Sequence, residues 1–114
     1  MPRDLRIYIE DMLEACRRIS EYTKNVDIVD LSQDIKTLDA VVRNLEIIGE
    51  AAKKTPAEFR SKHPNIEWKK ITGLRDILVH EYFGVDCEII LDVVKNKVPT
   101  LAINLQEVLK TMPE

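Results

Sequence analysis

Two long stretches of this chain carry apolar residues at alternating spacings of three and four, a period that a helix can bury along one face. The first stretch runs from residue 4 to about 22 and the second from about 31 to 54. Few turn-forming residues are available for a sheet, since the chain has only three glycines and five prolines. The sequence therefore predicts an all-α fold. The residues of the two apolar stripes are Leu5, Ile9, Met12, Cys16 and Ile19, then Ile35, Leu38, Val42, Leu45, Gly49 and Ala52.

The rest of the chain supplies further helices. "TPAE" at 55–58 has the pattern of a capping box with a Thr cap, and it predicts a short helix that "KHPN" ends. A longer helix is expected over about 66–80, with Trp68 packing at its start, and Pro99 is expected to kink or restart a last helical region. We expect one domain, 1–114, built as an up-and-down four-helix bundle with a short extra helix and a kinked last helix.

The chain shows no run long and apolar enough to span a membrane and no leader pattern at its start, so a cytoplasmic protein is expected. Cys16 and Cys87 lie far apart without CxxC spacing, which favours buried or half-buried thiols over a disulfide. His63 lies far in sequence from any second histidine or cysteine cluster. We therefore predict no metal site and no cofactor.

Charge is distributed unevenly along the chain, whose net charge is −3. Residues 58–75 carry five basic side chains against two acidic ones, whereas residues 76–114 carry three against seven. The basic strip could bind a phosphate, or it could be the solvated face of a helix.

The segment "GLRDILVHEYFGVD", residues 73–86, places charged and polar side chains in an apolar run. Asp76 and His80 are four residues apart and share a helix face, so the carboxylate can orient the imidazole. Arg75 and His80 are five apart, about 140° around the helix axis, and do not share a face. A twofold dimer would bring two copies of both residues to one cleft.

Arginine and histidine together suit metal-independent cleavage of RNA. An imidazole can take a proton from a ribose 2′-hydroxyl or give one to a leaving 5′-oxygen, and a guanidinium can stabilise a phosphate in the transition state. Structural roles explain the same residues: His80 could cap the helix C-terminus, Arg75 could pair with a carboxylate and Tyr82 could pack its ring.

The pattern Arg75-x4-His80-x-Tyr82 resembles the signature of the HEPN superfamily, specifically its HepT-like branch. "RNLEIIGEAAKK" at 43–54 and "HPNIEW" at 63–68 resemble two further segments of that branch, in the same order. The resemblance implies a helical homodimer that acts as a metal-independent ribonuclease toxin, with Arg75 and His80 lining an RNA-cleaving cleft at the dimer interface. It also implies a partner, an MntA-like nucleotidyltransferase antitoxin that transfers AMP to the motif tyrosine, here Tyr82.

Other polar residues could support such a cleft. The resemblance makes Asp76 the residue that orients His80. Arg43, Glu46 and Glu50 form a polar stripe on one side of their helix, where they could support the cleft or form ordinary surface ion pairs. Gly49, in the middle of that helix, predicts a close approach of another helix.

Three hypotheses follow for the function. The first is an endoribonuclease toxin of a toxin–antitoxin pair, inactivated by adenylylation of Tyr82. The second is a non-catalytic module that binds nucleotide or docks a minimal nucleotidyltransferase. The third is a structural dimerisation bundle whose motif residues serve as caps and ion pairs.

Overall fold

The computed structural model describes residues 3–80 and 87–113, and the side chains of these residues except those of 3–4 and 75–80. All elements in these ranges are helical, which confirms the all-α prediction, and none is long and apolar enough to cross a membrane. The elements are α1 (Arg3–Tyr22), α2 (Ile28–Gln33), α3 (Ile35–Lys54), α4 (Ala57–Lys62), α5 (Trp68–His80), α6 (Cys87–Asp92), the π-helical turn η2 (Val93–Lys97) and α7 (Val98–Thr111).

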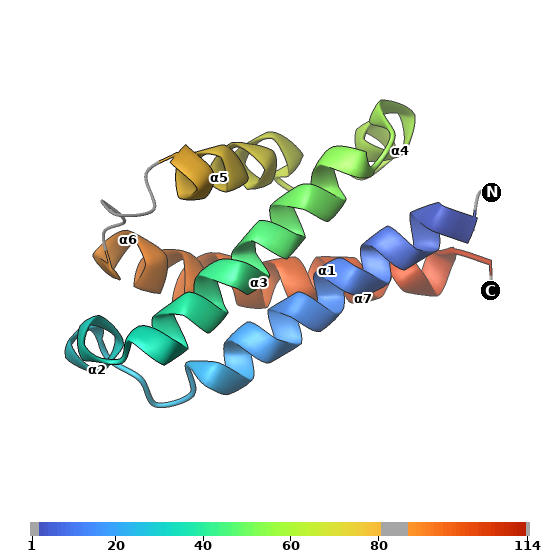
Figure 1. Cartoon of the computed structure of the whole chain (residues 1–114). Helices are drawn as coiled ribbons and strands as arrows, with labels where there is room; N and C mark the ends of the chain where they lie inside the picture. The colour runs from blue at the N-terminus through green and yellow to red at the C-terminus, as the bar shows by residue number, and fades with distance from the viewer. Residues whose placement is uncertain (1–2, 81–86, 114) are drawn as a thin grey trace.

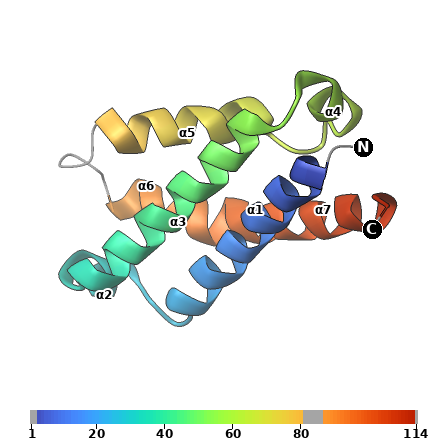
Figure 2. The same ribbon diagram turned by 45° about the vertical axis from the view of Figure 1, so that its right-hand side comes forward.

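Helix α3 is the central element, because it packs against both α1 and α5, while α1 also packs against α7 (Figure 1). The long helices α1, α3, α5 and α7 run in alternating directions in both views (Figures 1 and 2). The start of α1 lies beside the end of α7, where Arg6 donates from Nη1 to the carbonyl oxygens of Met112 and Pro113 at 3.5 and 3.4 Å.

The predicted apolar stripe of α1 forms part of the core. Ile9, Met12, Cys16 and Ile19 are fully buried. Most of the α3 stripe is also buried or packed against the core, but the prediction was wrong for Ile35, which is 70% exposed. Ile35 is the first residue of α3 and follows an exposed cap, so it lies at the solvent-facing end of the helix.

The prediction of one continuous helix over 31–54 was also wrong, because the chain breaks at Asp34. Asp27 and Asp30 form a capping box that starts α2. Asp34 then leaves the helical conformation, and its carboxylate accepts hydrogen bonds from the backbone N–H of Thr37 at 3.1 Å and from the Thr37 hydroxyl. Two aspartate caps seven residues apart satisfy the free N–H groups of two helix starts, so two helices form.

The predicted Thr cap of the short helix is not observed. The N-cap residue of α4 is Pro56, whose side chain forms no capping hydrogen bond. Thr55 is buried instead, and its hydroxyl donates to the carbonyl oxygen of Ala51 in the last turn of α3 at 2.9 Å. The hydroxyl therefore extends the hydrogen bonding of the preceding helix and does not cap the following one.

Pro99 interrupts the last helical region as predicted. The backbone widens into η2, and the N–H of Val98 donates to the carbonyl oxygen of Val93, five residues earlier. A proline in a regular α-helix would clash with the carbonyl four residues before it, here that of Lys95. The π turn widens the helix before Pro99, and α7 continues with the proline in its first turn.

Both cysteines are free thiols, as predicted. Cys16 is buried in α1, and Cys87 is half-buried at the start of α6. Burial raises the pKa of the Cys16 thiol to about 12, because a thiolate would lose its hydration in the core. Cys16 is therefore protonated at neutral pH and serves as a core residue.

Candidate functional site

Helix α5 carries the motif, and its first residue fixes it to the fold. Trp68 is 7% exposed, and its indole N–H donates to the carbonyl oxygen of His63 at 3.0 Å. Its ring also lies edge-on to Phe59 of α4, with 6.4 Å between the centroids. The prediction of Trp68 as a packing residue at the helix start is confirmed. Farther along α5, Ile71 and Leu74 pack against the core.

The motif residues lie at the far end of this helix. Arg75, Asp76 and His80 belong to α5, but their side chains are outside the described part of the structure, and Tyr82 is outside the described residues altogether. The regular helix puts Arg75 and His80 about 7.5 Å apart along its axis and about 140° apart around it. Their roles as catalytic residues stay predictions.

An apolar groove of about 500 Å³ lies beside the motif helix, between α5 and the segment formed by η2 and α7. Leu45 and Ile48 of α3 line it, together with Ile71 and Leu74 of α5 and Leu101 of α7. Its volume is in the range of ligand-binding clefts. Sequence analysis did not find this groove, because its walls come from three separate parts of the chain.

A charged cluster lies on the wall of the groove. Glu67 pairs with Lys70 at 2.9 Å, one turn along, and with Lys97 of η2 at 3.5 Å, thirty residues away. The hydrogen bond from Lys70, with the charges of both lysines, lowers the pKa of the Glu67 carboxyl. This cluster joins the start of α5 to η2 across the groove.

The predicted polar stripe of α3 is brought together only in part. Arg43 and Glu46 form an ion pair at 3.8 Å, with the arginine side chain 67% exposed. Glu50 is exposed and has no ion pair or hydrogen bond within the described part of the chain. An exposed pair of this kind contributes about 0 to 1 kcal/mol, so Arg43 and Glu46 are not needed to hold the fold.

A buried polar residue on the same helix was missed. Asn44 is 6% exposed; its Nδ2 donates to the carbonyl oxygen of Ala40 at 2.8 Å, and its Oδ1 is buried without a hydrogen-bond partner among the described residues. Such unpaired buried oxygens are uncommon in native proteins. An asparagine in mid-helix, inside "RNLEIIGEAAKK", was the sequence signal for it.

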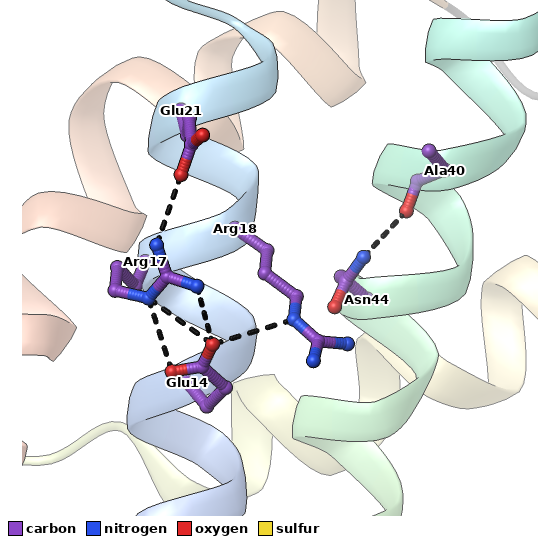
Figure 3. A network of polar contacts seen from close by, with 6 residues as sticks. All are labelled: Glu14, Arg17, Arg18, Glu21, Ala40 and Asn44. Atoms are coloured by element: carbon purple, nitrogen blue, oxygen red, sulfur yellow. Dashed lines mark hydrogen bonds and ion pairs between the residues drawn. The ribbon is translucent and has the colours of Figure 1, made fainter.

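Figure 3 shows an ion-pair network on α1 together with Asn44 on the neighbouring helix α3, and no interaction between the two is drawn. Arg17 binds both Glu14 and Glu21, and Arg18 lies 3.4 Å from Glu14 and extends into the space between the two ribbons (Figure 3). The Arg17 hydrogen bond lowers the pKa of the Glu14 carboxyl. These side chains are largely solvent-exposed, so the network is a surface feature of α1.

No group of three or more His, Cys, Asp or Glu side chains that could hold a metal ion occurs within residues whose side chains the structure describes. His63 contacts the ring of Phe59, with 4.6 Å between centroids, and its carbonyl accepts the Trp68 hydrogen bond. The geometry thus gives His63 a packing role at the start of α5.

Comparison with known proteins shows similarity along most of the chain. Residues 12–108 match the family model described as "Ribonuclease HepT-like". "Putative RNase MJ0127" of Methanocaldococcus jannaschii is 42% identical over 96% of this chain and 92% of its own length. "Probable ribonuclease HepT" of Thermococcus cleftensis is 44% identical over 89% of this chain and 92% of its own.

A third relative is a longer protein. "Gamma-glutamylcyclotransferase and putative RNase MJ0434" of Methanocaldococcus jannaschii is 44% identical over the whole of this chain, which spans half the length of that relative. No solved structure matches the chain.

Gly73 provides a test of whether the groove is open. A Cβ added at Gly73, which lines the groove in α5, meets no atom of the described residues within 4 Å, apart from its chain neighbours and the backbone of its own helix. Because alanine favours a helix by about 1 kcal/mol over glycine, we expect Gly73→Ala to raise the free energy of unfolding by up to about 1 kcal/mol. Urea denaturation measures this change.

Gly49→Ala is the matched control, since Gly49 also lies within a helix but is buried, so an added methyl group has to fit inside the protein. It is expected to give no such gain. A loss of stability in Gly73→Ala would show that the space beside Gly73 is filled in the folded protein.

Proposed function

Because this chain belongs to the HepT-like ribonuclease family, we propose that it is a metal-independent endoribonuclease. The observation that supports this most is the complete motif Arg75-x4-His80-x-Tyr82, which falls inside the matched residues 12–108. The proposed substrate is RNA, and the proposed location of the protein is the cytoplasm. The domain is a single helical unit, 1–114.

His80 moves the protons in the proposed reaction. The ribose 2′-oxygen attacks the adjacent phosphorus as the His80 imidazole takes its proton, and a P–O2′ bond forms. The P–O5′ bond breaks as the 5′-oxygen takes a proton from the resulting imidazolium, which returns His80 to its neutral form. The products are a 2′,3′-cyclic phosphate and a 5′-hydroxyl. The planar fork of Arg75 binds the phosphate oxygens and stabilises the added negative charge at phosphorus.

A homodimer completes the site. On one α5 helix, the positions of Arg75 and His80 lie about 140° apart around the axis, so one copy is poorly arranged to bring both residues to a single phosphate. A twofold axis next to the motif end of α5 would place the arginine of one protomer beside the histidine of its partner. Asp76, four residues before His80, orients the imidazole, and Arg43, Glu46 and Glu50 support the cleft.

We expect His80→Gln to lower the rate of RNA cleavage at least 100-fold, because proton transfer by a positioned side chain contributes about 10²–10⁴-fold. Arg75→Lys is expected to lower the cleavage rate by a similar factor, since lysine keeps the positive charge but lacks the planar guanidinium that binds two phosphate oxygens. Cleavage of a labelled RNA in the presence of EDTA, followed on denaturing gels, measures both.

His63→Gln is the matched control, because His63 is the other histidine of the chain and packs against Phe59. It should cleave RNA at the parent rate. Equal rates for the parent and His80→Gln would contradict the proposed role of His80. Saturable nucleotide or nucleotidyltransferase binding by a parent protein that cuts no RNA would favour the non-catalytic binding module.

We further propose that the chain is the toxin of a toxin–antitoxin pair and that an MntA-like nucleotidyltransferase inactivates it at Tyr82. The tyrosine oxygen would attack the α-phosphorus of ATP, forming a P–O bond as the bond to pyrophosphate breaks. An adenylate two residues from His80 would block the cleft and repel RNA phosphates, because it is bulky and negatively charged.

Tyr82→Phe removes the acceptor oxygen and should abolish adenylylation by the partner while RNA cleavage continues. Tyr22→Phe is the matched control, since Tyr22 is 42% exposed on α1 and should not alter the reaction. Intact mass of the protein after incubation with the nucleotidyltransferase and ATP reports the modification. AMP transfer to the Tyr82→Phe protein at the parent rate would place the acceptor elsewhere.

A further inference from the structure

One corner of the molecule concentrates positive charge. Residues 53–75 hold seven Lys and Arg against two Glu, whereas the other residues of the chain hold ten Lys and Arg against 18 Asp and Glu. Five exposed lysines of this segment form what we call the basic corner. They are Lys53, Lys54, Lys62, Lys69 and Lys70.

Specific contacts bring together the ends of the three helices that carry these lysines. Arg60 of α4 donates from Nε to the carbonyl oxygen of Thr55 at 2.8 Å and from Nη2 to that of Lys53 at 3.4 Å, which folds α4 back onto the end of α3. Phe59 of α4 then packs against Trp68, the first residue of α5. The end of α3, α4 and the start of α5 therefore meet at one end of the molecule (Figures 1 and 2).

Much of this charge is available to a ligand. Lys53, Lys54 and Lys69 have no carboxylate partner in the part of the chain that the structure describes. Lys62 and Lys70 pair with Glu58 and Glu67, but the lysine side chains are 69% and 75% exposed. Exposed pairs of this kind are weak and can exchange a carboxylate for a phosphate.

The side chains of the basic corner suit the phosphate backbone of a nucleic-acid strand better than they suit a protein surface. Protein interfaces rely on buried aromatic or aliphatic residues at their centre and contain few lysines. The exposed large apolar side chains of the described residues are Ile7, Tyr22, Val29, Ile35, Ile89 and Ile103. None of them belongs to the basic corner, so it offers charge without an apolar anchor.

We propose that the basic corner binds the backbone phosphates of the RNA on one side of the scissile bond, an inference that rests on the proposed ribonuclease function. Lys69 and His80 lie at opposite ends of α5, about 17 Å apart at 1.5 Å per residue. A dinucleotide bound at His80 cannot reach the corner, whereas a longer strand following α5 can. The corner thus contributes to the affinity for long RNA and takes no part in the chemical step.

The test compares two triple variants that change the net charge equally. Lys53→Gln/Lys54→Gln/Lys69→Gln removes the unpaired lysines of the corner. Lys24→Gln/Lys36→Gln/Lys110→Gln removes three exposed lysines outside it and is the control. Both are made with His80→Gln, so that RNA is not consumed, and binding is measured by fluorescence anisotropy with a labelled single-stranded RNA of about 20 nucleotides.

The corner triple is expected to raise the Kd about tenfold and to lower the slope of log Kd against log salt by about 2, since each lost phosphate contact removes about 0.7 from the slope for a single strand. The control triple should keep both values. Equal weakening by the two triples would show an effect of net charge alone and overturn the proposal, and unchanged binding by the corner triple would overturn it as well.

A second readout separates this inference from the function on which it rests. With His80 intact, the corner triple should cleave a dinucleotide at the parent rate and show a raised KM only for the long RNA. A parent protein that cleaves neither RNA fails the proposed function, while the anisotropy experiment still decides whether the corner binds RNA. A corner triple that loses dinucleotide cleavage contradicts the separation of binding from chemistry.

Discussion

Helix α3 packs between α1 and α5, and this packing holds the motif helix to the rest of the protein. Helix α1 is fixed by its buried stripe and by its contacts with α3 and α7. Helix α5, which carries the motif, packs mainly against α3, and Trp68 fixes its first turn through a hydrogen bond and an aromatic contact. The motif helix is thus held along one side and at one end, which leaves an apolar groove on its α7 side.

The periodicity of apolar residues predicted the helices that bury one continuous face. It failed where local side-chain hydrogen bonds determine where a helix begins or ends. The α1 stripe is buried as expected because its residues share one face of a helix that packs against α3 and α7. The break between α2 and α3 at Asp34 was missed because the spacing of apolar residues does not reveal an N-cap in the middle of an apolar pattern. Thr55 fitted a capping box by sequence, but burial turned its hydroxyl back to Ala51.

In the candidate site, too, the sequence predicted the features formed by neighbouring residues and missed those formed by residues far apart in the chain. The motif could be recognised because its residues lie close together in the sequence, as could the basic strip at 58–75. The pairing of Glu67 with Lys97 could not be foreseen, because thirty residues separate them. Lys53 and Lys54 join the basic corner only because Arg60 folds α4 onto the end of α3. Side chains that meet through tertiary packing leave no local pattern.

We propose that the motif end of α5 cleaves RNA by attack of the ribose 2′-oxygen, without a metal. The most direct test is to incubate the purified parent protein with RNA in the presence of EDTA and to identify the product ends by mass spectrometry. We predict cleavage that survives chelation and leaves a 2′,3′-cyclic phosphate or 3′-phosphate beside a 5′-hydroxyl. Products with a 5′-phosphate and a 3′-hydroxyl, or cleavage that stops with EDTA and returns with Mg²⁺, would contradict it.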